Sequence, residues 1–178
     1  MHLKHRRRLR EKPPFEAICD ILIEEGGAVG FYGEDKANAD IDRLALGRLC
    51  GVGSDGMALA ENGPLAGERE HPRCYGGMAY LIRTLVRERQ VMPLEKLIQK
   101  ITQFPAQRMR LKDRGTLREG AWADVVVFDP ERITDRATIQ NPCAYSEGVR
   151  WLFVNGTAAI ADGRLTGAKP GRVLRRDA

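Results

Sequence analysis

The sequence predicts an α/β fold followed by a smaller, separate β unit. Helix and strand patterns alternate over residues 13–54, at the spacing of a parallel α/β sheet or barrel. A β-branched run at residues 125–128 and an Asn155-Gly156 dipeptide between two strand-like runs mark the second region, because this dipeptide favours a tight hairpin. We therefore divide the chain into a basic segment (residues 1–12), an α/β part (13–112) and a β part (113–178).

The first predicted helix covers residues 15–25. Pro13-Pro14 fits a helix start, apolar residues recur every three or four positions, and Gly26-Gly27 supplies a stop. Three shorter elements follow, namely a strand over residues 28–32, a helix over residues 38–47 and a strand over residues 50–54.

The second of these strands ends in the turn Gly53-Ser54-Asp55-Gly56. In an α/β barrel, a side chain at the carboxyl end of a strand points into the active site. The Asp55 carboxylate is therefore a candidate general base or metal-side ligand. A plain turn is the alternative, because Asp and Gly are common turn residues, and the stretch alone leaves both interpretations open.

A long loop follows this turn, over residues 56–77, and a loop of this length in a compact unit is often functional. Beyond it, apolar stripes predict helices over residues 78–89 and 93–104, and a short one after Pro105 ends near Leu111. We interpret these stripes as core packing. The β part then carries strand-like runs at residues 125–128, 151–154 and 157–161.

Composition indicates a globular protein, with 178 residues, 43% hydrophobic and 30% charged. No apolar run approaches the ~18 residues needed to span a bilayer, and no secretory signal is evident, so the cytoplasm is the expected location. Four scattered cysteines without a CxxC pair argue against a zinc ribbon or a disulfide framework. Cys19 and Cys50 are predicted to be small core residues.

The net charge of +5 is concentrated at the two ends of the chain. Basic residues cluster at positions 5–10 and 172–176, without interleaved aromatic residues. Such ends are more often solvated tails than a nucleic-acid footprint. Binding to nucleic acid is therefore the least favoured function, and no membrane association is expected.

Several stretches match the pattern of one known family. Gly53-Ser54-Asp55-Gly56 with His71-Pro72-Arg73-Cys74-Tyr75-Gly76 resembles its SDG…HPR-x-YG segment. Residues 115–129, GTLREGAWADVVVFD, are similar to its G-x-L-x-x-G-x-x-AD-hydrophobic-FD signature. Residues 22–27, 154–156 and 162–172 match in the same order. The chain thus resembles the C-terminal part of the amidohydrolase superfamily, most closely the N-acyl-D-amino-acid deacylases (D-aminoacylases).

This resemblance implies the C-terminal portion of a (β/α)₈ barrel of the metal-dependent hydrolase type, plus part of its side β-sandwich. In the intact family, one or two zinc ions lie at the barrel mouth and a metal-bound hydroxide attacks the amide of an N-acyl-D-amino acid. Asp55 then corresponds to the catalytic residue that takes the water's proton and passes it to the leaving nitrogen. His71 and Arg73 are our candidates for binding the substrate carboxylate. Alternatively, they only shape the loop, stiffened by Pro72.

The family's metal ligands are missing from the sequence. The sequence contains three histidines, His2, His5 and His71. None of them falls at a ligand position of the family, and neither Cys50 nor Cys74 does. Catalytic zinc normally has three protein ligands, so we expect Asp55 to lie near a metal only in an intact site and this chain to bind none.

The barrel is expected to be incomplete, because a closed one needs about 250 residues. We interpret the chain as a C-terminal fragment of a deacylase, such as a truncated reading frame starting at Met1 would give, inactive alone. The alternative is a complementing subunit, which completes a barrel with a separate N-terminal polypeptide. Exposed apolar surface at the cut would also promote self-association.

Overall fold

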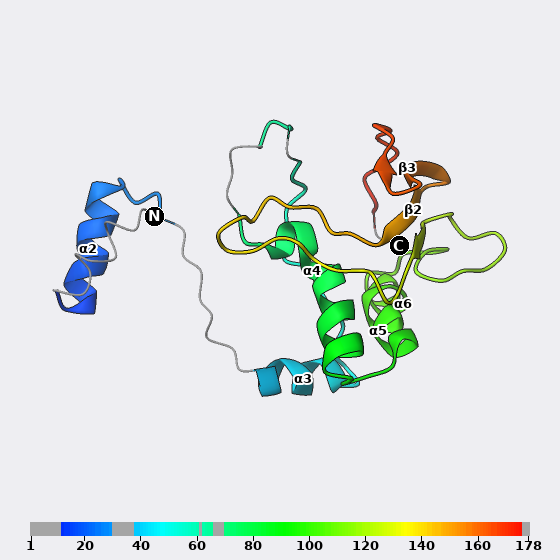
Figure 1. Ribbon diagram of the computed structural model, residues 1–178, viewed down its shortest axis with the longest axis horizontal. Coiled ribbons are helices and arrows are strands. Elements are labelled where there is room, and N and C mark those ends of the chain that lie inside the picture. Colours follow the sequence, from blue (N-terminus) through cyan, green and yellow to red (C-terminus); the bar gives the residue numbers. More distant parts are fainter. Residues whose placement is uncertain (1–11, 30–37, 61, 66–69, 176–178) are drawn as a thin grey trace. The chain divides into compact units, whose positions relative to one another are not determined.

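The computed structural model describes residues 12–29, 38–60, 62–65 and 70–175. The chain divides into two compact units, residues 1–35 and residues 36–178. The described part of the first unit contains a helix, and that of the second contains several helices followed by a four-stranded sheet (Figure 1). Within these described ranges, no helix combines the length and apolarity needed to cross a bilayer.

The helix of the first unit, α2 (Pro14–Glu24), confirms the prediction from the sequence. Pro14 lies in its first turn, where a missing N–H costs nothing. Gly27 has a φ of +81° and donates its N–H to the carbonyl of Leu22, 2.8 Å away, which closes the helix end. The strand predicted after it is not formed at Ala28 and Val29, and its remaining residues lie outside the described part.

The second unit begins with the predicted helix α3 (Asn38–Leu46). The strand predicted over residues 50–54 is wrong, because this stretch belongs to no strand or sheet. Its Val52 N–H bonds to the carbonyl of Lys100, 3.3 Å away, on a helix rather than on a strand. A strand needs a neighbouring strand for its backbone groups, and the described residues bring none here.

The next helix starts earlier than predicted, since α4 covers Arg73–Leu81 and follows Pro72, whose φ is −50°. Gly76 and Gly77 look like loop residues in the sequence but lie within this helix. A Cβ on Gly76 would lie 2.7 Å from the Cβ of Asp135, so the glycine permits a close approach. The helix continues as a π-helical segment, η1 (Ile82–Glu88).

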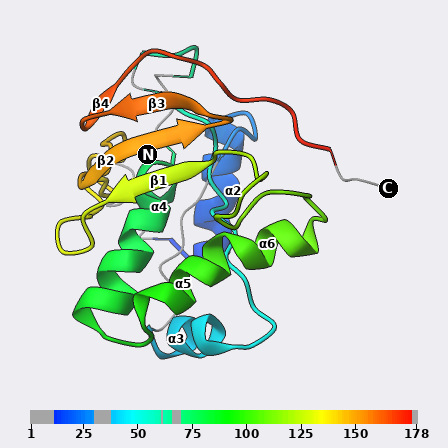
Figure 2. The ribbon, with the colours of Figure 1, turned by 90° about the vertical axis from the view of Figure 1, so that its right-hand side faces the viewer.

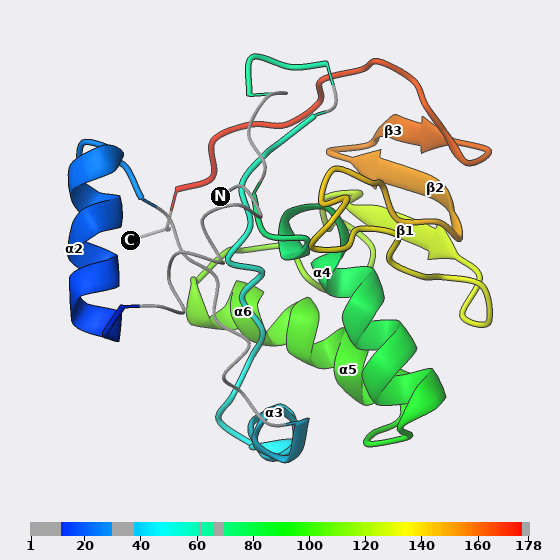
Figure 3. The same cartoon turned by 60° about the vertical axis from the view of Figure 1, so that its left-hand side comes forward.

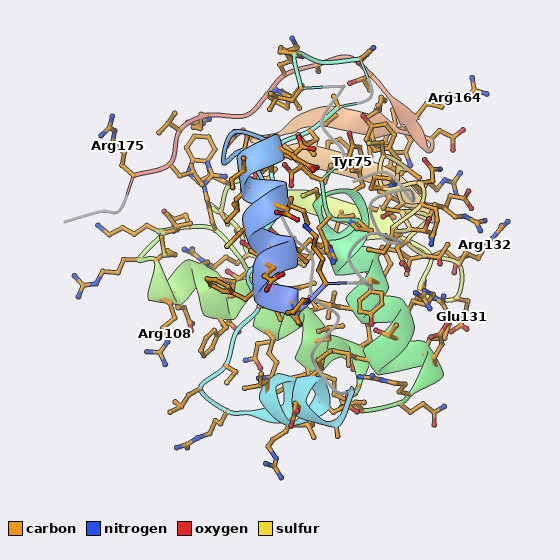
Figure 4. The ribbon with its side chains drawn as sticks, turned by 90° about the vertical axis from the view of Figure 1, so that its left-hand side faces the viewer. Tyr75, Arg108, Glu131, Arg132, Arg164 and Arg175 are labelled. Carbon is orange, nitrogen blue, oxygen red and sulfur yellow. The ribbon has the colours of Figure 1, made fainter. Side chains whose placement is uncertain are left out.

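Two further helices, α5 (Leu94–Ile101) and α6 (Gln103–Arg108), confirm the predicted pair (Figure 3). The apolar stripe of α5 shares one core cluster with α4 and η1, in which Leu85 and Leu97 are completely buried. The core also contains Met92 and Ile133, which the sequence analysis did not single out. The apolar stripes are therefore packing surfaces, as predicted.

The β part is an antiparallel sheet in the order β1-β2-β3-β4 (Figure 2). Its strands are β1 (Val125–Phe128), β2 (Val149–Val154), β3 (Thr157–Ala161) and β4 (Arg164–Leu165). The predicted hairpin is confirmed, since Asn155 and Gly156 have φ values of +49° and +84°, as a tight hairpin turn requires. No parallel strand pair occurs among the described residues, so the sheet itself does not display the predicted barrel.

An ion-pair network joins the helices to the segment after β1. Arg83 in η1 donates from Nε to Asp135 at 2.7 Å and from Nη1 to Glu88 at 2.8 Å. The hydrogen bond to Asp135 raises the pKa of Arg83 above its ordinary value, against the opposing effect of burial. Arg87 donates to the carbonyls of Pro130 and Ile133, each 2.9 Å away. The helical part and the sheet of this unit are thus fixed to each other.

Candidate active site

Asp55 lies in a strained turn that exposes its carboxylate. Its φ is +47°, in the left-handed region that Asp tolerates better than most residues. The N–H of Gly56 bonds to Oγ of Ser54, 3.3 Å away, which closes the turn. The side chain of Asp55 is 81% exposed, so the carboxylate is accessible to a ligand.

Arg73, the first residue of α4, holds this turn at two points. Its Nη2 lies 3.0 Å from Oδ2 of Asp55, and its Nε donates to the main-chain carbonyl of Asp55 at 3.2 Å. Gly56 packs closely on the start of the same helix, because an added Cβ would lie 3.3 Å from the Cα of Cys74. Residues 18 positions apart are thus joined in one site.

His71 lies two residues before Arg73 and is half-buried. The N–H of Arg73 donates to Nδ1 of His71, 3.1 Å away. An imidazole nitrogen that accepts a hydrogen bond carries no proton, so in this arrangement Nε2 carries the proton of a neutral ring. Arg73 therefore contacts both Asp55 and His71, and the roles assigned to these three residues stay predictions.

The donor set around Asp55 does not fit a zinc ion. Within the described part of the chain, no three His, Cys, Asp or Glu side chains gather as metal ligands do, and the nearest charged partner of Asp55 is a cation, Arg73. His2 and His5 lie outside the described residues. Cys50 and Cys74, which the sequence analysis does not count as ligands, are free, half-buried thiols.

The sequence analysis missed a residue that supports the turn, Lys100 in the last turn of α5. Its side chain is buried, and Nζ donates to the carbonyls of Gly47 and Cys50 at 2.6 and 2.8 Å. A signal was present, because Lys100 follows Leu97 by three positions and so shares its helix face.

The family model described as "Amidohydrolase family" matches residues 69–160, which is more than half of the chain. The chain therefore belongs to the amidohydrolase family, a family of hydrolases, and the resemblance found in the sequence is confirmed.

Curated relatives point to one branch of this family. The chain is 38% identical over 152 residues to N-acyl-D-glutamate deacylase, and 40% identical over 153 residues to N-acyl-D-aspartate deacylase, both from Alcaligenes xylosoxydans xylosoxydans. D-aminoacylase from the same organism is 31% identical over 169 residues, which cover 95% of this chain. The chain spans under a third of the length of these relatives, between 28% and 32%.

Solved structures support the same assignment. A D-aminoacylase, described by the role of its binuclear metal centre, superposes with a TM-score of 0.69 at 36% identity and covers 79% of this chain and 28% of its own. N-acyl-D-glutamate deacylase from Bordetella bronchiseptica, complexed with zinc and a phosphonate inhibitor, gives a TM-score of 0.65 at 38% identity, covering 78% of this chain and 28% of its own. These likenesses support a metal-dependent amidohydrolase fold of the barrel class.

Proposed function

We propose that this chain supplies the part of the active site that transfers protons in an N-acyl-D-amino-acid deacylase. Such an enzyme hydrolyses the amide bond of N-acyl-D-amino acids. The observation that carries the proposal is the exposed Asp55 carboxylate, anchored by Arg73 in a chain of this family. Residues 13–112, whose described part forms helices and loops without a strand, would then belong to the end of the barrel, and residues 113–178 to its side β-sandwich. The similarity to three deacylases over most of the chain supports the deacylase assignment.

In this proposal Asp55 takes a proton from the attacking water and delivers it to the leaving amide nitrogen. A carboxylate can accept the proton in the first step, and the carboxylic acid so formed can return it in the second. Arg73 and His71, on the loop beside it, would bind the carboxylate of the N-acyl-D-amino acid. Arg73 offers a charged fork, and His71 offers the N–H of Nε2.

Hydrolysis by this chain alone is not expected. Deacylases related to it are metal proteins by their descriptions, whereas the described residues gather no metal-ligand set. We therefore place the zinc ligands of the working enzyme on residues other than those around Asp55. In this proposal the site is active only where those ligands are present.

A complementing subunit is the second candidate. Large apolar side chains are exposed next to the Asp55 turn, with Leu49 at 73% and Met57 at 46%, as expected for a surface that another part of a barrel covers. Co-expression with a polypeptide that carries the N-terminal two thirds of a deacylase tests this candidate. Recovery of the two chains as one complex is expected, and separate migration at all concentrations would reject it.

Replacement of Asp55 by Asn tests the catalytic role. In the completed enzyme, Asp55→Asn should lower kcat about 10²–10⁴-fold, the usual contribution of a general acid–base. Asp162→Asn is a matched control, because Asp162 is also an exposed turn residue, with a φ of +48° and an arginine, Arg150, 3.3 Å away. Equal activities of the two variants would contradict the proposal. Stoichiometric zinc and turnover in the isolated chain would contradict its inactivity alone.

A further inference from the structure

The buried ammonium of Lys100 has only main-chain acceptors. Lys100 is 4% exposed, and its Nζ donates to the carbonyls of Gly47 and Cys50. No carboxylate pairs with it among the residues that the structure describes. A buried charge is costly unless its donors are satisfied. The two hydrogen bonds from Nζ therefore restrict the positions of the Gly47 and Cys50 carbonyls.

Gly47 follows directly after α3, which ends at Leu46, and Cys50 lies three residues further along the loop. The carboxyl end of a helix carries partial negative charge and attracts a cation, which favours an ammonium beside Gly47. The carbonyl of Cys50 is an ordinary main-chain acceptor. Both acceptors belong to the main chain, so Lys100 binds the backbone after α3 and not a side chain that could move independently.

Two more contacts hold the same stretch on α5 and α6. The N–H of Val52 bonds to the main-chain carbonyl of Lys100, 3.3 Å away. Gly51 lies against the ring of Phe104, since an added Cβ would be 2.5 Å from its Cδ1. Residues 47–52 are thus held by the side chain and the main chain of Lys100 and by an aromatic ring.

We propose that Lys100 is a positioning residue for Asp55. Only two residues, Gly53 and Ser54, separate Val52 from Asp55, so the end of the held stretch lies within about 10 Å along the chain from the carboxylate-bearing residue. Lys100 fixes the turn from its N-terminal side, and Arg73 fixes it from the other side. Any effect of Lys100 on hydrolysis rests on the function proposed above. Its effect on the position of the Asp55 turn does not.

Lys100→Met tests the proposal, because methionine fills similar volume without donors. Two hydrogens report on the turn by NMR exchange, the N–H of Val52 and the Nε–H of Arg73, which donates to the carbonyl of Asp55. We expect both to exchange about tenfold faster, as for a local opening. The N–H of Thr166, bonded to Ala159 in the sheet, should be unchanged. Lys96→Met is the control, because Lys96 is exposed on the same helix.

Equal acceleration at the turn and in the sheet would mean general destabilisation and would overturn the proposal, as would no change at Arg73. Should Lys100→Met fail to fold, Gly51→Ala displaces the same stretch against Phe104 with Lys100 intact. Its control is Gly53→Ala, where an added Cβ meets nothing within 4 Å. An unchanged Arg73 signal in Gly51→Ala would again reject the proposal. These rates do not depend on catalysis, so they are independent of the Asp55→Asn assay.

Discussion

Arg73 binds both the carboxylate and the main-chain carbonyl of Asp55, through Nη2 at 3.0 Å and Nε at 3.2 Å. One edge of the guanidinium is therefore committed to Asp55. The side chain nevertheless remains 43% exposed, and the planar fork has a second pair of donors at its outer end. Under the proposed function, Arg73 would thus connect the Asp55 carboxylate to a carboxylate of the substrate.

Arg73→Lys should impair substrate binding more than stability. Lysine keeps the charge but cannot use two edges at once, and a hydrogen bond to a charged group contributes about 1.5–3 kcal/mol. We expect KM in the completed enzyme to rise roughly 10–100-fold, at about 1.4 kcal/mol per tenfold. The midpoint of thermal unfolding should hardly change, because an exposed ion pair contributes at most about 1 kcal/mol.

Arg118→Lys is the control for this variant, since Arg118 is likewise exposed and pairs with an aspartate, Asp113. Its KM should equal that of the unmodified chain. An Arg73→Lys enzyme with unchanged KM would show that Arg73 only shapes the loop.

Asp135→Asn should destabilise the second unit. Asp135 is 13% exposed and accepts from Nε and Nη2 of Arg83, at 2.7 and 3.2 Å. The variant leaves a half-buried guanidinium with a weaker partner, at a cost of about 1–3 kcal/mol. For a chain of this size, the unfolding midpoint falls by about 2–4 °C per kcal/mol. Asp113→Asn removes an exposed carboxylate instead and should shift the midpoint little; equal shifts would contradict the assigned role of Asp135.

Local signals predicted most of the helices and the hairpin. Proline at a helix start and glycine at its end defined α2, and Asn155-Gly156 defined the β2–β3 turn, because these residues act through their own dihedral angles. The strand that the local sequence predicted over residues 50–54 is absent from the structure. An extended stretch becomes a strand only when another strand pairs with it, and the sequence of the stretch does not contain that information.

The same distinction between local signals and tertiary contacts applies to the candidate site. Asp55, His71 and Arg73 could be named because they lie in short motifs, but their contacts depend on α4 starting at Arg73 rather than at Met78. Gly76 indicates a loop in the sequence, but the structure needs a glycine within the helix because Asp135 packs closely against it. This tertiary contact cannot be predicted from the local sequence. Lys100 was missed because helix spacing places it beside Leu97 but does not reveal that its ammonium is buried.

Glu147 should titrate differently when Arg136 is removed. The hydrogen bond from Arg136, 2.6 Å long, lowers the pKa of Glu147 below its ordinary value, and the same bond raises the pKa of Arg136. A carboxyl group whose pKa is lowered by folding stabilises the fold at pH values above its pKa in the unfolded state. This contribution is lost as the pH falls through the pKa of the folded state. The raised arginine pKa keeps its contribution until strongly alkaline pH.

Arg136→Gln should therefore raise the pKa of Glu147 toward its ordinary value, as followed by the carboxyl carbon signal in NMR. High salt should reduce the difference between the two proteins, because exposed charges are screened. Arg150→Gln removes an exposed arginine that pairs with Asp162 instead and should leave the titration of Glu147 unaltered. A pKa that stays low in Arg136→Gln would refute the pairing.

Three glycine-to-alanine variants separate backbone strain from steric contact in the β part. Gly171 has no left-handed φ and open space around it, Gly156 has a φ of +84° and open space, and Gly148 has a φ of +94°. A Cβ on Gly148 would also lie 2.4 Å from the Cα of Ile133, a backbone atom that cannot move aside easily. The three positions therefore differ by one feature at a time.

Gly171→Ala should leave the free energy of unfolding unchanged or raise it by up to about 1 kcal/mol, since alanine restricts the unfolded chain. Gly156→Ala should lower it by about 1–2 kcal/mol, the cost of a left-handed conformation with a Cβ. Gly148→Ala adds the clash with Ile133 and should lower it further. Chemical denaturation followed by the fluorescence of Trp122 and Trp151 measures all three. A Gly148→Ala protein as stable as Gly156→Ala would show that the segment before Ile133 yields without cost, contrary to its anchoring by Arg87.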